Sequence, residues 1–278
     1  MTHSRPRIHE LLDGLAPRRD LGQNFVADPN TVRRIAALAG VGAGDHVVEI
    51  GAGLGSLTLA LAETGAEITA VEVDADLVPV LRDVVAPSSN VSVVEADATR
   101  VDWSQLLAGS DRWTLVANLP YNVATPLVCD LLDEVPGIAS MLVMVQKEVA
   151  ERFVASPGSK QYGAVSIKVA YWATARLVAT VPPSVFVPRP NVDSALVRIE
   201  RRTPPATDPQ QLFAVVRAAF THRRKMLRRS LSSVVTADQF AIAEISPEAR
   251  PEQLSLDDWC RLTDAVTSTA PAATPGPA

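Results

Sequence analysis

Five short runs rich in valine and isoleucine recur along the first half of the chain, and this recurrence constrains the fold more than any other feature. Helix-like segments separate the runs, at residues 56–64, 75–85, 124–135 and 147–155. Nearly continuous apolar strands that alternate with helices are typical of a parallel sheet covered on both faces. The sequence therefore predicts an α/β domain with strands at residues 45–51, 67–74, 91–97, 113–118 and 140–146.

Beyond residue 175 this alternation ends. Two further strand candidates, residues 176–181 and 194–201, flank the proline-rich loop 182–193. We expect them to form a hairpin that is added at the edge of the sheet.

The last part of the chain is predicted to be helical. Residues 203–209 are rich in proline and polar side chains, which indicates a linker. Residues 210–235 and 256–267 then show helical periodicity. We therefore predict an α/β domain over residues 1–203, a separate helical domain over 208–267 and a disordered tail over 268–278.

Charge is distributed unevenly along the 278 residues. The chain has 26 Lys and Arg against 31 Asp and Glu, so its net charge of −5 does not by itself suggest a nucleic-acid partner. Between residues 41 and 115 twelve acids oppose three bases, whereas residues 209–237 contain six bases and no acid. Such asymmetry indicates a polyanionic partner for the basic segment.

Cysteine and histidine usage gives no sign of a metal site or a disulfide framework. Cys129 and Cys260 are far apart in the sequence, and the four histidines form no HExxH motif. The composition, 47% hydrophobic and 21% charged, is typical of a globular protein, and no stretch approaches the roughly 20 apolar residues of a membrane span. We expect a cytoplasmic monomer that binds neither metal nor membrane.

The first chemical motif follows the first predicted strand and contains Gly51, Gly53 and Gly55. Glycines here let the backbone turn sharply and approach a ligand at the start of the next helix. The nicotinamide dinucleotide fingerprint needs a glycine where this chain has Ser56, and the compressed spacing favours S-adenosylmethionine (SAM). The alternative is a tight turn that binds no ligand.

Acidic residues end the next two predicted strands. Glu72 lies 21 residues after Gly51, where a carboxylate can accept both ribose hydroxyls of an adenosine cofactor. Asp97 can accept the exocyclic amine of the adenine, and Ala98 can donate its backbone N–H. A solvated acid at a strand end is the alternative for each. Together with the glycine turn, these residues predict a cofactor site at the carboxyl ends of the strands.

The most specific motif is Asn118-Leu119-Pro120-Tyr121, at the end of the fourth predicted strand. The chemistry that this motif fits is methylation of an adenine N6 amino group. That group is a poor nucleophile because its lone pair is delocalised into the ring. The Asn118 side-chain carbonyl and the Leu119 backbone carbonyl can accept hydrogen bonds from it and favour its tetrahedral form, mostly in the transition state. Tyr121 and Phe186 can stack on the two faces of the base. The alternatives are a capping Asn, a turn Pro and core aromatic residues.

Together these residues resemble the rRNA adenine N6,N6-dimethyltransferase family, most closely its bacterial small-subunit type. The likeness runs from residue 21 to about residue 231 and includes segments 21–25, 186–193 and 220–227. It implies a Rossmann-like SAM-dependent methyltransferase sheet with a small C-terminal helical domain. The implied reaction dimethylates two adjacent adenosines near the 3′ end of small-subunit rRNA in the assembling 30S subunit. The implied SAM-binding residues are Gln23, Asn24, Phe25, Gly51, Gly53, Glu72, Asp97, Ala98 and Asn118.

The basic segment is predicted to bind RNA through one face of a helix. At 3.6 residues per turn Arg224 and Arg228 lie one turn apart, and Lys225 and Arg229 form the neighbouring row. A solvated helix face is the alternative. Arg229 stands where relatives often have Asn, a departure from the family pattern. The candidate RNA-binding residues are Arg223, Arg224, Lys225, Arg228 and Arg229.

Three other functions fit parts of the sequence. The large-subunit rRNA adenine methyltransferase that confers macrolide resistance shares the chemistry, but the Asn118 motif and segment 220–227 favour the small-subunit type. An RNA-binding assembly factor could keep the fold without catalysis, although the intact Asn118 motif argues against a dead enzyme. A NAD-dependent dehydrogenase is disfavoured by Ser56.

Overall fold

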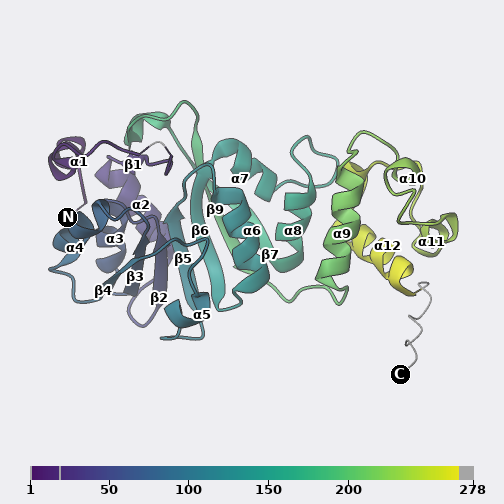
Figure 1. The fold of residues 1–278 in the computed structure, drawn as a ribbon, viewed down its shortest axis with the longest axis horizontal. Helices are drawn as coiled ribbons and strands as arrows, with labels where there is room; N and C mark the ends of the chain where they lie inside the picture. Colours follow the sequence, from purple (N-terminus) through teal and green to yellow (C-terminus); the bar gives the residue numbers. More distant parts are fainter. Residues whose placement is uncertain (1, 19, 269–278) are drawn as a thin grey trace, which may run out of the picture. The chain divides into compact units, whose positions relative to one another are not determined.

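A computed structural model describes residues 2–18 and 20–268 of the chain (Figure 1). Its contacts define two compact units. The first contains the described residues up to Glu151 together with Thr174–Arg201, and the second contains Arg152–Ala173 and the described chain from Arg202 onward. A single boundary near residue 203 therefore does not describe the division of the chain, because residues 152–173 pack with the helical unit. The expected tail lies outside the described residues except for residue 268, which ends a helix.

The first unit is built on a seven-stranded sheet with the strand order β4-β3-β2-β5-β6-β9-β7. Its five parallel strands coincide with the five predicted ones, and β9 pairs antiparallel with β6 while β7 forms the edge, as expected for an added hairpin. The α/β prediction is thus confirmed. The strands are β2 (His46–Ile50), β3 (Glu67–Glu72), β4 (Val91–Glu95), β5 (Trp113–Asn118), β6 (Ile138–Gln146), β7 (Ala173–Val181) and β9 (Ser194–Arg201).

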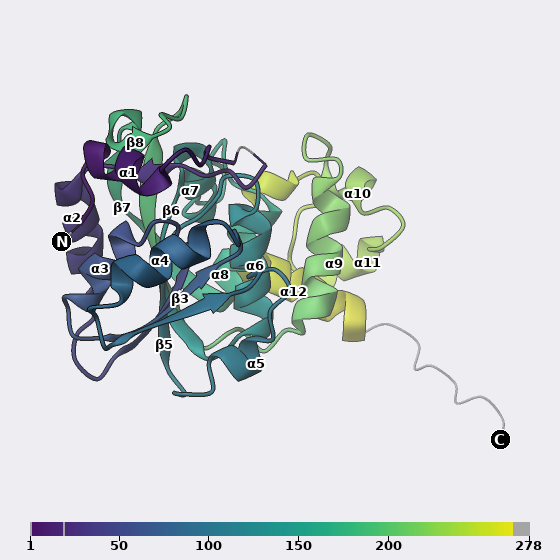
Figure 2. The ribbon, with the colours of Figure 1, turned by 60° about the vertical axis from the view of Figure 1, so that its left-hand side comes forward.

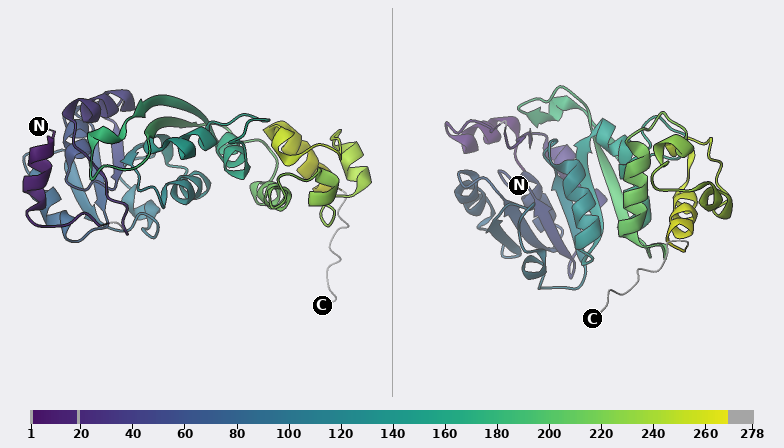
Figure 3. Two further views of the ribbon diagram at one scale, coloured as in Figure 1. Left: turned by 90° about the horizontal axis from the view of Figure 1, so that it is seen from above. Right: turned by 45° about the vertical axis from the view of Figure 1, so that its right-hand side comes forward.

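Seven helices of the described chain belong to the first unit or begin in it. Helices α4 and α6 lie on the viewer's side of the sheet in Figure 2, and α6 does so again in the right-hand view of Figure 3. Helices α2 and α3 bury Val32, Ile35, Leu57 and Leu61 against the strands. The helices are α1 (Arg5–Leu12), α2 (Pro29–Ala39), α3 (Ser56–Ala62), α4 (Leu77–Val85), α5 (Trp103–Leu106), α6 (Ala124–Glu134) and α7 (Lys147–Phe153).

A second, two-stranded sheet brings two distant segments together. Strand β1 (Phe25–Val26) pairs antiparallel with β8 (Phe186–Val187), which follows the short 3-10 helix η1 (Pro183–Val185). The N-terminal helix α1 lies nearby, because Ile8 and Leu12 share a core cluster with Phe25 and Leu54. The N-terminal segment and the 182–193 loop are thereby anchored beside the glycine turn.

The helical unit has its own core around Trp259, which is fully buried. The prediction of one helix over residues 210–235 is wrong, because the chain leaves the helical conformation in the middle of this range. Helix α9 ends at Phe220, and Met226 is extended, with φ −63° and ψ 149°. The backbone N–H groups of Leu227 and Arg228 donate to the carbonyls of Ala249 and Pro247 at 2.8 and 2.9 Å, so tertiary hydrogen bonds replace the helical ones. The elements are α8 (Ala164–Trp172), α9 (Pro209–Phe220), α10 (Leu227–Ser230), α11 (Ala237–Ile242), η2 (Pro251–Gln253) and α12 (Leu256–Ser268).

None of the helices in residues 2–18 and 20–268 is both long and apolar enough to cross a membrane. Within the same residues, no three His, Cys, Asp or Glu side chains gather in a group that could hold a metal ion.

Candidate cofactor and target-base site

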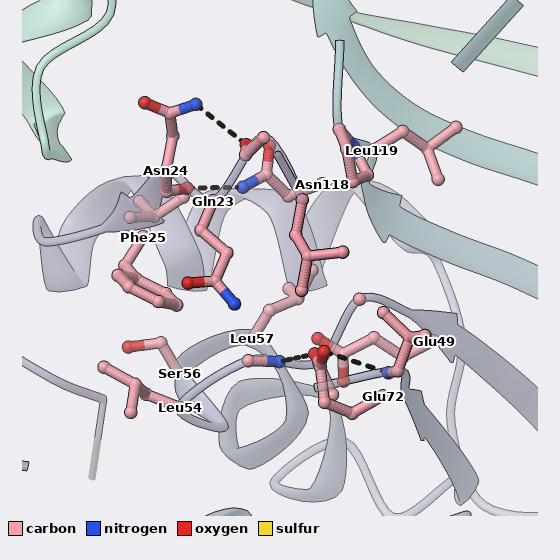
Figure 4. A pocket seen from close by; sticks show the side chains of 18 of the residues that line it. Gln23, Asn24, Phe25, Glu49, Leu54, Ser56, Leu57, Glu72, Asn118 and Leu119 are labelled. Atoms are coloured by element: carbon pink, nitrogen blue, oxygen red, sulfur yellow. Dashed lines mark hydrogen bonds between the residues drawn. The ribbon is translucent and has the colours of Figure 1, made fainter. Parts of the chain in front are cut away.

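The candidate site lies at the carboxyl ends of the parallel strands, where the sequence places it. Two adjoining pockets share Leu21, Gly51, Val73 and Pro120. The first is lined by Gln23, Asn24, Phe25, Gly51, Gly53, Glu72, Asn118, Leu119, Pro120 and Tyr121, and Figure 4 shows most of their side chains. The second is lined by Asp97 and Ala98 together with Gly51. The fold thus brings the nine candidate cofactor-binding residues to one edge of the sheet.

The turn after β2 needs backbone conformations that favour glycine. Gly51, Gly53 and Gly55 have φ values of 72°, 56° and 81°, in the left-handed region that other residues rarely adopt. A Cβ atom on Gly53 would lie 3.0 Å from the Phe25 ring. The chain therefore passes close under Phe25, and Gly51 and Gly53 line the first pocket just before α3 begins.

Glu72 connects the end of β3 to this turn. Its carboxylate accepts hydrogen bonds from the backbone N–H groups of Gly53, Val73 and Asp74 at 2.7, 3.0 and 2.9 Å. Burial raises the pKa of Glu72, although these three bonds oppose the rise. The side chain is therefore held at the pocket wall by the backbone of the protein itself.

Glu49 is a second buried acid, to which the sequence analysis gives no role. It belongs to β2, is 1% exposed and lines the first pocket. Burial, with a smaller contribution from the charge of Glu72, raises the pKa of Glu49 to about 8. Its Oε2 atom has no hydrogen-bond partner among the described residues. An acid inside the apolar run of the first predicted strand is the sequence signal that could have identified it.

Asp97 lines the second pocket. Its Oδ1 atom accepts from the backbone N–H and the hydroxyl of Thr99 at 2.9 and 2.7 Å, and these bonds lower the pKa of Asp97. The Oδ2 atom lies 3.7 Å from Nε of Arg100. Ala98 is buried beside it.

The Asn118 side chain has a defined orientation at the end of β5. Its Nδ2 atom donates to the backbone carbonyl of Asn24 at 2.9 Å, so that Oδ1 is left to accept from a ligand (Figure 4). The backbone N–H of Leu119 donates to the carbonyl of Met144 at 3.0 Å, and Pro120 follows. The hydroxyl of Tyr121 shares a hydrogen bond with Ser194 Oγ at 2.7 Å, and burial raises the pKa of Tyr121.

The side chain of Phe186, which the sequence predicts to stack on the target base, is buried in this structure. Its side chain is 0% exposed and belongs to the core cluster between the sheet and α2 and α3. Pairing of β8 with β1 turns the ring inward, and it lines neither pocket. The core interpretation of Phe186 is therefore the one that this structure supports.

The basic segment does not form a single helix face, and two of its cations lie beside acidic side chains. Arg223 pairs with Glu252 at 2.7 Å, and Arg228 lies 3.6 Å from Glu248, because the chain folds back over residues 246–253. Residues 221–224 form turns, Lys225 lies at a bend and Met226 is extended, so the predicted helical rows do not exist. Exposed cations without an ion pair to any described residue remain at Arg224, Lys225 and Arg229.

The residues present fit SAM. A nucleoside cofactor with a cationic end needs acceptors for its ribose and ammonium groups and a close backbone, and Glu72, the unsatisfied Glu49 Oε2 and the glycine turn supply these features. Ligands of open α/β sheets bind where the strand order reverses, here between β2 and β5. The fold and the pocket together define a SAM-dependent methyltransferase.

Comparison with known proteins narrows this class. The family model for ribosomal RNA adenine dimethylase matches residues 14–268, and the chain belongs to this family. It is 47% identical over 267 residues to ribosomal RNA small subunit methyltransferase A of Cutibacterium acnes, covering 91% of this chain and 90% of that protein. It is 48% identical over 260 residues to the protein of the same name from Leifsonia xyli subsp. xyli, covering 90% and 93%. The chain is therefore an rRNA adenine dimethyltransferase that uses SAM.

Solved structures support the same fold. The 23S rRNA methyltransferase ErmE aligns with a TM-score of 0.69 and 25% identity, over 87% of this chain and 99% of that one. A dimethyladenosine transferase from Plasmodium falciparum aligns with a TM-score of 0.70 and 23% identity, over 84% and 94%. The predicted Rossmann-like methyltransferase sheet with C-terminal helices is confirmed.

The raised pKa of Glu49 predicts a pH-dependent loss of stability. Because the folded protein holds the Glu49 proton to about pH 8, this group stabilises the fold fully below its unfolded pKa of 4.5 and loses that contribution as the pH rises to about 8. Glu49→Gln should then raise the free energy of unfolding by up to about 3 kcal/mol at pH 7 and leave it unchanged near pH 4. Denaturant titrations between pH 4 and 9 measure the difference. Glu95→Gln, at the exposed end of β4, is the control, and equal pH profiles for the two variants would contradict the prediction.

Proposed function

We propose that this chain dimethylates the N6 amino groups of two adjacent adenosines near the 3′ end of small-subunit rRNA, within the assembling 30S subunit. Its identity to the small-subunit methyltransferases, 47% and 48%, is about twice its 25% identity to the 23S enzyme. We further propose that it acts as a monomer in the cytoplasm, where ribosomal subunits of bacteria are assembled.

The Asn118 amide carries this proposal. Bound SAM supplies an electrophilic methyl group on a sulfonium. The target N6 must then acquire nucleophilic character, and it does so when its protons, two in the first transfer and one in the second, are held by acceptors that favour tetrahedral geometry. The Oδ1 atom of Asn118 is one acceptor, because Nδ2 already donates to Asn24. The Leu119 carbonyl is the other, in a turn fixed by Pro120 and by the N–H bond to Met144.

Proton release needs no side-chain base in this scheme. The amino nitrogen becomes strongly acidic once it is methylated, so water can take its proton. Tyr121 is unsuited to act as a base because burial raises its pKa. Its ring lines the first pocket and offers a stacking face to a base that has left its helix.

The remaining pocket residues are proposed to bind different parts of the cofactor. We assign the ribose hydroxyls to Glu72, and the adenine amine to the Oδ2 atom of Asp97 with the backbone N–H of Ala98. Gly51 and Gly53 allow close backbone approach. Gln23, Asn24 and Phe25 form the opposite wall, where Gln23 Nε2 donates to Asp74 at 2.6 Å.

Primer extension across the 3′ end of small-subunit rRNA tests the proposed function. Two methyl groups on N6 remove the Watson–Crick donor, so a dimethylated adenosine stops reverse transcriptase. RNA from cells that express the chain should give a stop that is missing when the gene is deleted and restored when it is returned. A stop at an adenosine of large-subunit rRNA would instead support the large-subunit function.

Replacing Asn118, which also lines the cofactor pocket, should slow chemistry far more than it weakens cofactor binding. Asn118→Ala removes an acceptor that strengthens in the transition state, and single-turnover methylation of subunits should fall by about two to three orders of magnitude. Calorimetry should show a SAM affinity within about threefold of the parent. A rate reduced by less than about tenfold would contradict the proposed role.

Replacing Glu72 should weaken SAM binding. Loss of a charge-assisted acceptor costs roughly 1.5 to 3 kcal/mol, so the Kd of Glu72→Ala should rise at least about tenfold in calorimetry. Glu67→Ala is the matched control, because Glu67 is the exposed acid at the other end of the same strand. Equal affinities for the two variants would exclude Glu72 from the ribose site.

The exposed basic residues should set the salt dependence of subunit binding. Changing Arg224, Lys225 and Arg229 together to Gln should weaken binding and flatten its dependence on log salt by roughly 2 to 3 units, because each phosphate contact contributes about 0.7 to 0.9. A second triple variant, with Arg33, Arg82 and Arg112 changed to Gln, removes the same charge at exposed sites elsewhere. If the salt dependence of binding flattens equally in both variants, net charge and not this segment determines it.

A further inference from the structure

The loop of residues 20–24 lies against the motif that holds Asn118. The Asn24 carbonyl accepts from Asn118 Nδ2 at 2.9 Å, and the Asp20 carbonyl accepts from Asn122 Nδ2 at 3.4 Å. Gly22 lies between these two contacts, with φ +64°. The loop therefore docks on both sides of Pro120.

Gly22 is the residue that permits this close approach. A Cβ atom at this position would lie 3.1 Å from Cβ of Pro120 and 3.2 Å from Oδ1 of Asn122. The positive φ would strain any other residue as well. The side chain of Asn24 donates to the Gly22 carbonyl at 3.0 Å, which fixes the turn (Figure 4).

The contact with Asn24 decides which end of the Asn118 amide can meet the target base. An amide has a donor end and an acceptor end of similar shape, and a backbone carbonyl can only accept. While the Asn24 carbonyl is in place, the NH₂ group must point to it and Oδ1 must point away. If the carbonyl moved, the amide could rotate and present its donors to the N6 protons, which would repel them.

We propose that loop 20–24, with Gly22 at its centre, is a positioning element that orients the catalytic amide. The same loop contacts the cofactor wall through Gln23 and Asp74, so one short segment aligns both partners of the methyl transfer. This inference rests on the proposed role of Asn118 as an acceptor, and it assigns to Gly22 and Asn122 a role that acts through Asn118.

Gly22→Ala compared with Gly40→Ala tests the proposal. Gly40 has a similar φ of +68°, but nothing lies within 4 Å of its Cβ position, so it reproduces the backbone strain without the steric contact. At saturating SAM, Gly22→Ala should lower the single-turnover rate on subunits at least about tenfold and leave the Kd for subunits within about twofold. Gly40→Ala should retain the rate within about twofold. Equal rates for the two variants would overturn the proposal.

A double-mutant cycle separates positioning from a general structural effect. If Gly22 acts through Asn118, adding Gly22→Ala to Asn118→Ala should change the remaining rate by less than about twofold. If Gly22→Ala lowers the rate as much in the Asn118→Ala background as in the parent, the inference is overturned. If Asn118→Ala alone keeps the parent rate, the proposed function of Asn118 itself is overturned.

Asn122→Ala provides a second route in case Gly22→Ala does not fold. It removes the contact with Asp20 without adding an atom, and the rate should fall at least about threefold in the parent background and by less than about twofold beside Asn118→Ala. A parent-like rate for Asn122→Ala overturns the proposal.

Discussion

The burial of two carboxyl groups is the constraint around which this site is built. Glu49 and Glu72 come from the neighbouring parallel strands β2 and β3, and both lose most of their hydration in the folded chain. Glu72 recovers part of that loss through three backbone N–H groups, and those bonds also hold the glycine turn in place. Glu49 recovers less, and burial raises its pKa to about 8. These backbone contacts hold the pocket wall, at a cost in stability that hydrophobic packing elsewhere in the sheet offsets.

The sheet and most of the pocket could be predicted from the sequence because their determinants are local. A buried parallel strand needs an unbroken apolar run, and the turn after β2 needs glycines at positive φ, so both are visible as residue types in order. The residues at strand ends, from Gly51 to Asn118, then converge because the carboxyl ends of parallel strands meet at one edge. Glu49 was overlooked, since its role depends on burial and not on its place in the glycine motif.

The errors arose where distant residues determine the structure. The helix predicted through residue 225 is broken because the N–H groups of Leu227 and Arg228 find carbonyl partners more than 18 positions away, at Ala249 and Pro247. The pairing of Arg223 with Glu252 has the same origin, and it reduces the charge available to RNA. The burial of Phe186, which we predict to stack on the base, also depends on a distant partner, because pairing of β8 with β1 places its ring in the core. Periodicity and composition contain no information about such partners.

The strand order explains why the methyl donor and the target can meet. Strand β2 lies between β3 and β5, so its glycine turn is flanked by Glu72 on one side and Asn118 on the other. Gly53 N–H bonds to Glu72, while a Cβ on Gly51 would lie only 3.8 Å from the backbone carbonyl of Asn118. Had β4 stood beside β2 in place of β5, the acceptor amide would project from a strand that does not border the cofactor turn. Transfer of a methyl group needs its two partners in contact and in line, and here adjacency of strands within one sheet provides the contact while the loop of residues 20–24 controls the alignment.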